Sequence, residues 1–97
     1  MKGYWLILKA EVSDQEAQAK YNRLWRPIEE RYEARINPTK VPPLLVEVRD
    51  APHVIVVEFP SPEAAKACYE DSDYQEARRV ALRAAPRELM ILQGDLG

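Results

Sequence analysis

The chain has 97 residues, of which 46% are hydrophobic and 31% charged, and its formal net charge is −2. A chain of this length forms one small domain, expected here to span residues 1–97, and the weak negative charge argues against nucleic acid or an anionic membrane as partner. The single cysteine excludes an internal disulfide, and the N-terminal apolar run is too short for a signal peptide or a membrane span. We therefore expect a cytoplasmic protein.

The first third of the chain predicts a strand followed by a helix. Residues 3–10 carry apolar side chains on both faces of an extended segment. Residues 13–16, SDQE, form a capping box, which marks the start of a helix. Its apolar stripe has spacings of three and four residues and consists of Ala17, Tyr21, Leu24, Ile28 and Tyr32.

The middle of the chain predicts a loop and a β-hairpin. Residues 37–43, NPTKVPP, are typical of a loop. Residues 44–50 alternate in polarity, which predicts a strand that turns at residues 50–52 into the next one. That next strand contains VIVV at residues 54–57, four β-branched residues favoured in sheets.

The last part predicts two helix starts and a final strand. Pro60 ends the VIVV strand, and Ser61 with Pro62 supplies an N-cap and a favourable first helical residue. SDYQ at residues 72–75 is a second capping box, so the helix should break near Asp71 and restart. Residues 87–93 form another strand that is apolar on both faces.

This βαββαβ order predicts an α+β, ferredoxin-like fold: a four-stranded antiparallel sheet with its helices on one face. The helices cover one face only, yet three of the four strands are apolar on both. A soluble monomer rarely exposes so large an apolar surface. We therefore expect a homodimer in which two sheets face each other and form an α+β barrel.

Several segments resemble one bacterial family. GYW near the start, EFPSPEAA, the SDYQ that follows it and the late LMILQGD are similar to the family called domain of unknown function 1330. The resemblance implies membership of the dimeric α+β barrel superfamily, and hence a ferredoxin-like protomer and a sheet-to-sheet dimer. That superfamily includes cofactor-free monooxygenases, isomerases, haem enzymes and ligand-binding domains, so the resemblance implies no single activity.

Glu58 is the first candidate for chemistry. It shares a strand face with Val54 and Val56, so it faces the barrel interior if the larger residues of the strand face the helices. There its carboxylate could be a general acid or base with a raised pKa. Alternatively, Arg49, Lys9 or an arginine of the partner chain neutralises it in a structural ion pair.

The other candidates each have two interpretations. His53, the single histidine, could be an acid or base near neutral pH or a turn residue half in water. Tyr4, Tyr69 and Tyr74 match tyrosines of the family pattern and, with Arg49, are candidates to line a pocket, although tyrosines at helical spacing also suit a core.

The late arginines form a basic cluster, which suits a helix C-terminus or, alternatively, an anion site. Its members are Arg78, Arg79, Arg83 and Arg87.

No spacing of histidine and cysteine predicts a metal site, and no glycine-rich motif predicts a nucleotide, so we expect no cofactor. Three functions fit these observations. The first is binding of a small organic ligand in a pocket of the sheet. The second is a cofactor-free enzyme, isomerase-like or monooxygenase-like, that uses Glu58 or His53. The third is a non-catalytic dimerisation module.

Overall fold

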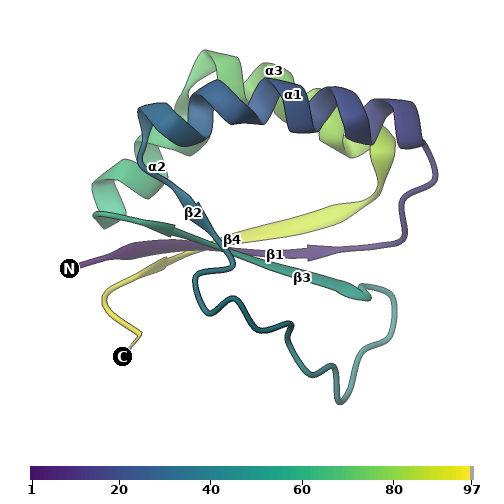
Figure 1. Ribbon diagram of the computed structural model, residues 1–97, viewed down its shortest axis with the longest axis horizontal. Coiled ribbons are helices and arrows are strands. Elements are labelled where there is room, and N and C mark those ends of the chain that lie inside the picture. The colour runs from purple at the N-terminus through teal and green to yellow at the C-terminus, as the bar shows by residue number, and fades with distance from the viewer. Residues whose placement is uncertain (97) are drawn as a thin grey trace.

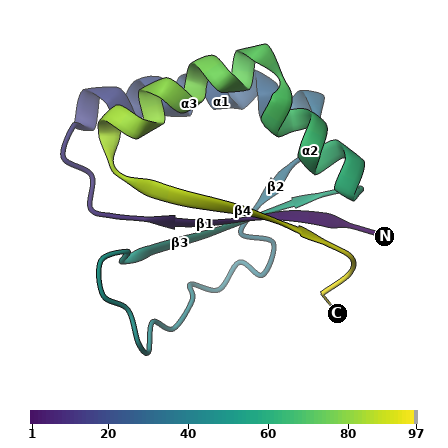
Figure 2. The same ribbon diagram turned by 180° about the vertical axis from the view of Figure 1, so that it is seen from behind.

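A computed structural model describes residues 1–96 as four strands and three helices. Their order is β1 (Gly3–Lys9), α1 (Gln15–Arg31), β2 (Arg35–Ile36), β3 (His53–Phe59), α2 (Pro62–Glu70), α3 (Ser72–Ala84) and β4 (Arg87–Gln93). The strands form one antiparallel sheet in the order β2-β3-β1-β4. All three helices lie on one side of it, the helix face, and the segment 37–52 lies on the other, the outer face (Figures 1 and 2). The α+β, ferredoxin-like prediction is confirmed. Within residues 1–96, every helix is too short or too polar to cross a bilayer.

The helix starts follow from local hydrogen bonds at their caps. The Asp14 carboxylate accepts a hydrogen bond from a backbone N–H three residues on, at 3.0 Å, and the Ser61 hydroxyl does the same at 3.0 Å. The predicted break near Asp71 is confirmed. The cap there is Asp71 itself, whose carboxylate accepts from the N–H of Asp73 at 2.8 Å.

The predicted strand at residues 44–50 is wrong, and with it the predicted hairpin. β3 instead pairs at this edge with the two residues of β2. Just beyond β2, the side-chain oxygen of Asn37 accepts a hydrogen bond from the N–H of Val56 at 3.2 Å, where a strand would offer a backbone carbonyl. Asn37 also has a left-handed φ of 49°, and the prolines at positions 38, 42 and 43 lack the N–H that a ladder needs. The chain therefore leaves the sheet at Asn37.

The core on the helix face is built around Trp5. Its side chain is fully buried, and its ring lies 4.8 to 6.1 Å, centroid to centroid, from the rings of Trp25, Phe59, Tyr69 and Tyr74. Its indole N–H donates to the backbone carbonyl of a residue in α2 at 2.9 Å. Such ring pairs add stability beyond the area they bury, so this cluster joins β1 to all three helices and to β3.

The outer face of the sheet is apolar and only partly covered. Leu6, Val56 and Met90 lie side by side on it, because they are paired positions of β1, β3 and β4. Met90 is 40% exposed. The 37–52 segment itself exposes apolar side chains, among them Leu44, which is 88% exposed. The single chain thus leaves uncovered a surface of a kind that soluble proteins usually bury.

Gly3 lies where β1 passes closest to the start of α2. A Cβ added to Gly3 would stand 2.6 Å from Pro62 Cα and 2.7 Å from the Ser61 carbonyl oxygen, which are both backbone atoms. We expect Gly3→Ala to lower the free energy of unfolding by about 2 kcal/mol, because backbone must move to admit the methyl group. Urea unfolding measures this. Gln93→Ala is the control, since Gln93 is the exposed residue paired with Gly3 on β4. Equal stability of the two variants would contradict this close packing.

Candidate functional site

Glu58 lies on the outer face, as its position in the strand predicts, and both of its carboxylate oxygens are engaged. Oε1 accepts a hydrogen bond from Lys2 Nζ at 3.1 Å, and Oε2 accepts one from Arg35 Nη1 at 3.3 Å. Arg35 is the residue opposite Glu58 on β2, whereas Arg49, an expected partner, lies in the exposed 37–52 segment. The buried Tyr4 is the opposite residue on β1. This geometry favours a structural ion pair.

His53 begins β3 and is exposed, with Nε2 3.3 Å from the carboxylate of Glu11. Side chains alternate between faces along a strand, so His53 and Glu58, five residues apart, belong to opposite faces of the sheet. The two candidates for acid–base chemistry therefore do not share a site.

Tyr69 and Tyr74 belong to the aromatic core on the helix face. Tyr74 is fully buried, its hydroxyl accepts a hydrogen bond from Arg87 Nη2 at 2.8 Å, and burial raises its pKa well above the ordinary value. Tyr69 packs edge-on against Trp5. The six site residues predicted from the sequence therefore do not form one site. They lie in four places: the outer face, the exposed 37–52 segment, the start of β3 and the core.

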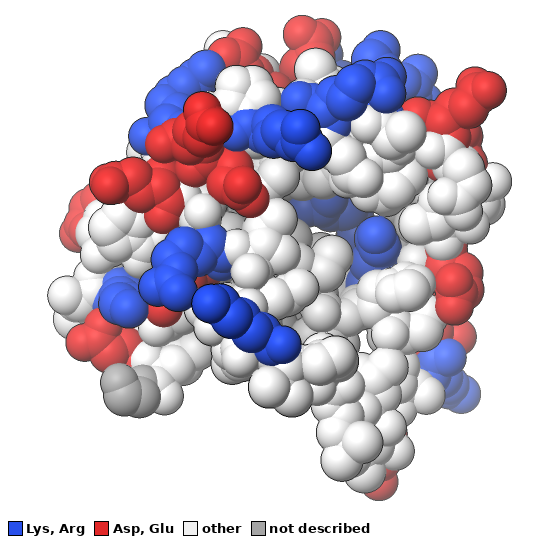
Figure 3. Space-filling view, in the orientation of Figure 1, with Lys and Arg blue, Asp and Glu red and all other residues white. Residues whose placement is uncertain are grey.

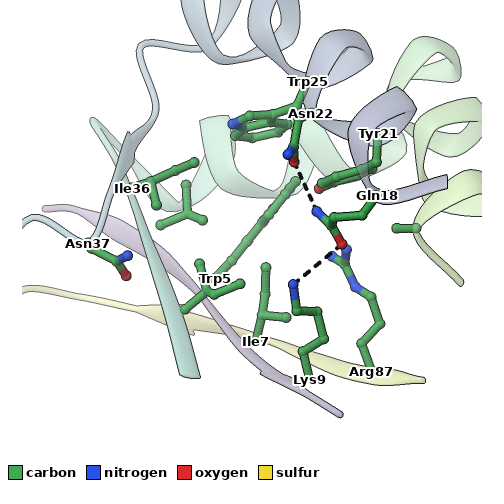
Figure 4. Close-up of a pocket in the computed structure, with 13 residues that line it drawn as sticks. Trp5, Ile7, Lys9, Gln18, Tyr21, Asn22, Trp25, Ile36, Asn37 and Arg87 are labelled. Atoms are coloured by element: carbon green, nitrogen blue, oxygen red, sulfur yellow. Dashed lines mark hydrogen bonds between the residues drawn. The ribbon is translucent and has the colours of Figure 1, made fainter. Parts of the chain in front are cut away.

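A cavity of about 180 Å³ lies between the helix face of the sheet and α1. Figure 4 shows Trp5 and Ile7 on the sheet side and Trp25 projecting from α1 on the other. Ile55 and Val57 of β3 complete its apolar wall. The cavity is thus a gap in the packing of the core itself.

The other end of the cavity is polar and basic. Lys9 and Arg87 face each other as paired residues of β1 and β4, and both side chains extend toward α1 (Figure 4). Lys9 Nζ donates to Gln18 Oε1 at 3.4 Å, and Gln18 Nε2 donates to Asn22 Oδ1 at 2.9 Å. The guanidinium carbon of Arg87 lies 5.5 Å from the ring centroid of Tyr21. Burial, and next the charge of Arg87, lower the pKa of Lys9, while Glu11 opposes them.

Sequence reasoning assigned neither cation to this site. Lys9 was a possible partner of Glu58, and Arg87 belonged to a cluster of four arginines that suited a helix C-terminus or, alternatively, an anion site. One part of the site could have been predicted from the sequence. Lys9 lies two and four residues from Ile7 and Trp5 in the same strand, so its side chain must point to the same face as theirs. The pairing of Lys9 with Arg87 depends on the register between two strands that lie far apart in sequence.

The cavity lining suits an organic molecule better than a metal ion. Throughout residues 1–96, no three side chains of His, Cys, Asp or Glu come together as metal ligands. The polar groups around the cavity are amides, a phenol and two cations, which are poor metal ligands. Cys68 is buried elsewhere in the core, and burial raises its pKa to about 12, so its thiol stays protonated at neutral pH.

A pair of substitutions can test directly whether the cavity exists. Ala81 on α3 lines it, whereas the neighbouring Ala84 is fully buried and packs against other residues. We expect Ala81→Leu to change the free energy of unfolding by less than about 0.5 kcal/mol, because its added carbons enter free space. Ala84→Leu should lower it by about 1–3 kcal/mol, because it overpacks. Chemical denaturation of both variants checks this, and a large loss of stability for Ala81→Leu would argue against the cavity.

A second pair of substitutions tests whether Glu58 has a structural role. We expect Glu58→Gln to lower the free energy of unfolding by no more than about 1 kcal/mol, because Lys2 and Arg35 are largely exposed and water screens the pairs. The loss should shrink in high salt. Glu88→Gln, on the same face of β4, makes the same chemical change and serves as control. A stable Glu58→Gln variant that has lost a catalytic turnover would overturn the structural role.

Solved structures with the same fold cover nearly the whole chain. A protein of unknown function from Rhodopseudomonas palustris is 23% identical, with a TM-score of 0.67 over 99% of this chain and 84% of that one. A dimeric ferredoxin-like protein from Thermobifida fusca is 8% identical, with a TM-score of 0.61 over 97% and 92%. An EthD-family protein from Bacillus halodurans is 12% identical, with a TM-score of 0.59 over 98% and 100%. At these identities the likeness shows the fold alone.

The sequence comparison is more specific. No curated protein matches the chain. The sequence pattern that defines the family described as "Domain of unknown function (DUF1330)" matches residues 2–95, which is nearly the full length. This chain therefore belongs to the DUF1330 family.

Proposed function

We propose that this protein is a homodimer that binds a small organic molecule in the cavity between its sheet and α1. The observation that carries the proposal is the cavity, in which an apolar wall faces a few convergent polar groups. Ligand sites in proteins typically have this composition, with apolar side chains supplying affinity and a small number of polar groups fixing orientation.

The size of the cavity limits the ligand. An apolar cavity of about 150 Å³ is large enough to hold benzene. The volume of about 180 Å³ here therefore suits a body of one ring with a small polar substituent. A nucleotide or a multi-ring cofactor would not fit without a rearrangement of α1.

The position of the cavity offers a route from solvent. Ile36, Asn37 and Asn22 all line it and are all exposed, so they mark a rim between β2 and α1. Figure 3 shows basic side chains recessed in a hollow below the helix layer on this side of the molecule. A ligand entering there would meet the polar end of the cavity together with its apolar wall.

The outer face supports the homodimer. Leu6, Val56 and Met90 form an apolar surface on the sheet, and the 37–52 segment adds exposed apolar side chains beside it. Two structures with this fold, from Thermobifida fusca and Bacteroides fragilis, are described as dimeric. A second copy placed against the outer face would bury this surface. The cavity lies on the helix face, so ligand binding and dimerisation can be tested separately.

Native mass spectrometry of protein purified without added ligand tests both parts. We expect a dimer of the 11.2 kDa chain that carries a small additional mass, because an apolar cavity retains its ligand through purification. The Ala81→Leu variant should give the dimer without the additional mass. A monomer would contradict the homodimer. A bare dimer that also takes up no small aromatic compound would favour the dimerisation module instead.

A further inference from the structure

We infer that the ligand of this cavity is a small carboxylate with an apolar body of about one ring, and that Lys9 and Arg87 bind its carboxylate group. The inference deepens the proposed binding function and rests on it. Its basis is an arrangement of charge around the cavity that the fold alone does not require.

The first observation is that two cations are placed directly against each other. Lys9 and Arg87 are paired across β1 and β4, they share the helix face, and both are at least half-buried. Like charges directly opposite in a sheet destabilise it, and removing each from water adds to the cost. A neutral residue at either position would avoid this cost.

The second observation is that, within residues 1–96, neither cation forms an ion pair with a carboxylate. Glu11 acts on Lys9 only from a distance: it raises the pKa of Lys9 against the larger effect of burial, and its own carboxylate lies 3.3 Å from His53. The chain has 16 aspartate and glutamate residues, yet none of the residues described as lining the cavity is acidic. Within residues 1–96, the ion pairs of the protein's lysine and arginine side chains are made by Lys2, Arg31 and Arg35. Among the residues that the structure describes, the lysines and arginines that form ion pairs are therefore exposed ones, and the two that line the cavity form none.

The third observation is that the contacts of these cations are with neutral groups. Lys9 has the amide oxygen of Gln18 at 3.4 Å, which is a long hydrogen bond. Arg87 has the Tyr74 hydroxyl at 2.8 Å and the ring of Tyr21 at 5.5 Å. These groups fix the positions of the side chains but leave the charge available. Arginine carries five N–H donors in a planar fork that matches a carboxylate, so one bond to Tyr74 leaves donors for a ligand.

The wall opposite the two cations indicates what kind of apolar group the ligand carries. Trp5 and Trp25 present aromatic surfaces there, and Ile55 packs beside them. A flat apolar ring would lie against this wall while its carboxylate reaches Lys9 and Arg87. The same pair of charges would repel a cationic compound of the same shape, so the cavity selects by charge as well as by size.

Three isosteric compounds test the inference: benzoate, benzamide and benzamidine have nearly the same shape and carry negative, zero and positive charge. Both tryptophans of the chain line the cavity, so intrinsic fluorescence reports occupancy directly. We expect benzoate to bind about tenfold more tightly than benzamide, because charged hydrogen bonds contribute more than neutral ones, and benzamidine to bind most weakly. The preference for benzoate should fall as ionic strength rises.

A matched set of variants assigns the preference to the cavity. Lys9→Gln should weaken benzoate binding about tenfold and change benzamide binding by less than about twofold, and Lys9→Arg should retain tight benzoate binding. Lys66→Gln makes the same charge change at an exposed position on α2 and should leave both affinities unchanged. Urea unfolding of Lys9→Gln verifies that the variant remains folded.

The outcomes separate this inference from the proposed function. If benzoate and benzamide bind the parent equally, or if Lys9→Gln binds benzoate as tightly as the parent does, the carboxylate preference is overturned and the ligand cavity stands. If none of the three compounds binds, and the parent and the Ala81→Leu variant carry the same mass in native mass spectrometry, both the inference and the binding function are overturned.

Discussion

The placement of the Trp5 indole is the constraint on which the rest of the structure depends. It is fully buried, its N–H is bound to a carbonyl of α2, and its ring contacts aromatic residues of α1, β3 and α3. Each helix is therefore positioned against the sheet through one side chain of the central strand β1. The same ring forms part of the cavity wall, so the proposed ligand site is a continuation of the core. A site with walls this well packed holds its shape without a ligand.

The parts of the fold that were predictable are those encoded by local signals. The caps at Asp14 and Ser61 and the β-branched run in β3 act over a few residues, and the elements they predict are present. Residues 44–50 have an alternating pattern as well, but alternation only shows that a segment is compatible with a strand. A strand also needs a partner, and the edge of β3 is used by β2 and by the side chain of Asn37. That competition between distant residues is not visible in the sequence.

The candidate site shows the same limit more sharply. Glu58 is a candidate from the sequence because it is a charged residue within an apolar strand. The alternation of side chains along that strand correctly predicts that it lies on the outer face. Its partners Lys2 and Arg35 could not be predicted, since Arg35 becomes its neighbour only through the position of β2. Lys9 and Arg87 lie at the ends of their strands, where a charge is ordinarily solvated. Only the register between β1 and β4, and the position of α1 above them, make them a pair in a cavity.

Within residues 1–96, the charge of Glu58 is neutralised on one face of the sheet but those of Lys9 and Arg87 on the other face are not, and this difference is the strongest argument for a ligand. On the outer face, Glu58 is held by two cations. On the helix face, Lys9 and Arg87 repel each other at a cost of about 0.2–1 kcal/mol, which a domain with a stability of about 5–15 kcal/mol can tolerate. An anion bound between them would reverse that cost, and a ligand present at about 100 times its Kd would add about 2.7 kcal/mol to the stability. The free protein thus keeps a local repulsion that a bound anion would remove, which is the pattern expected where residues serve binding rather than folding.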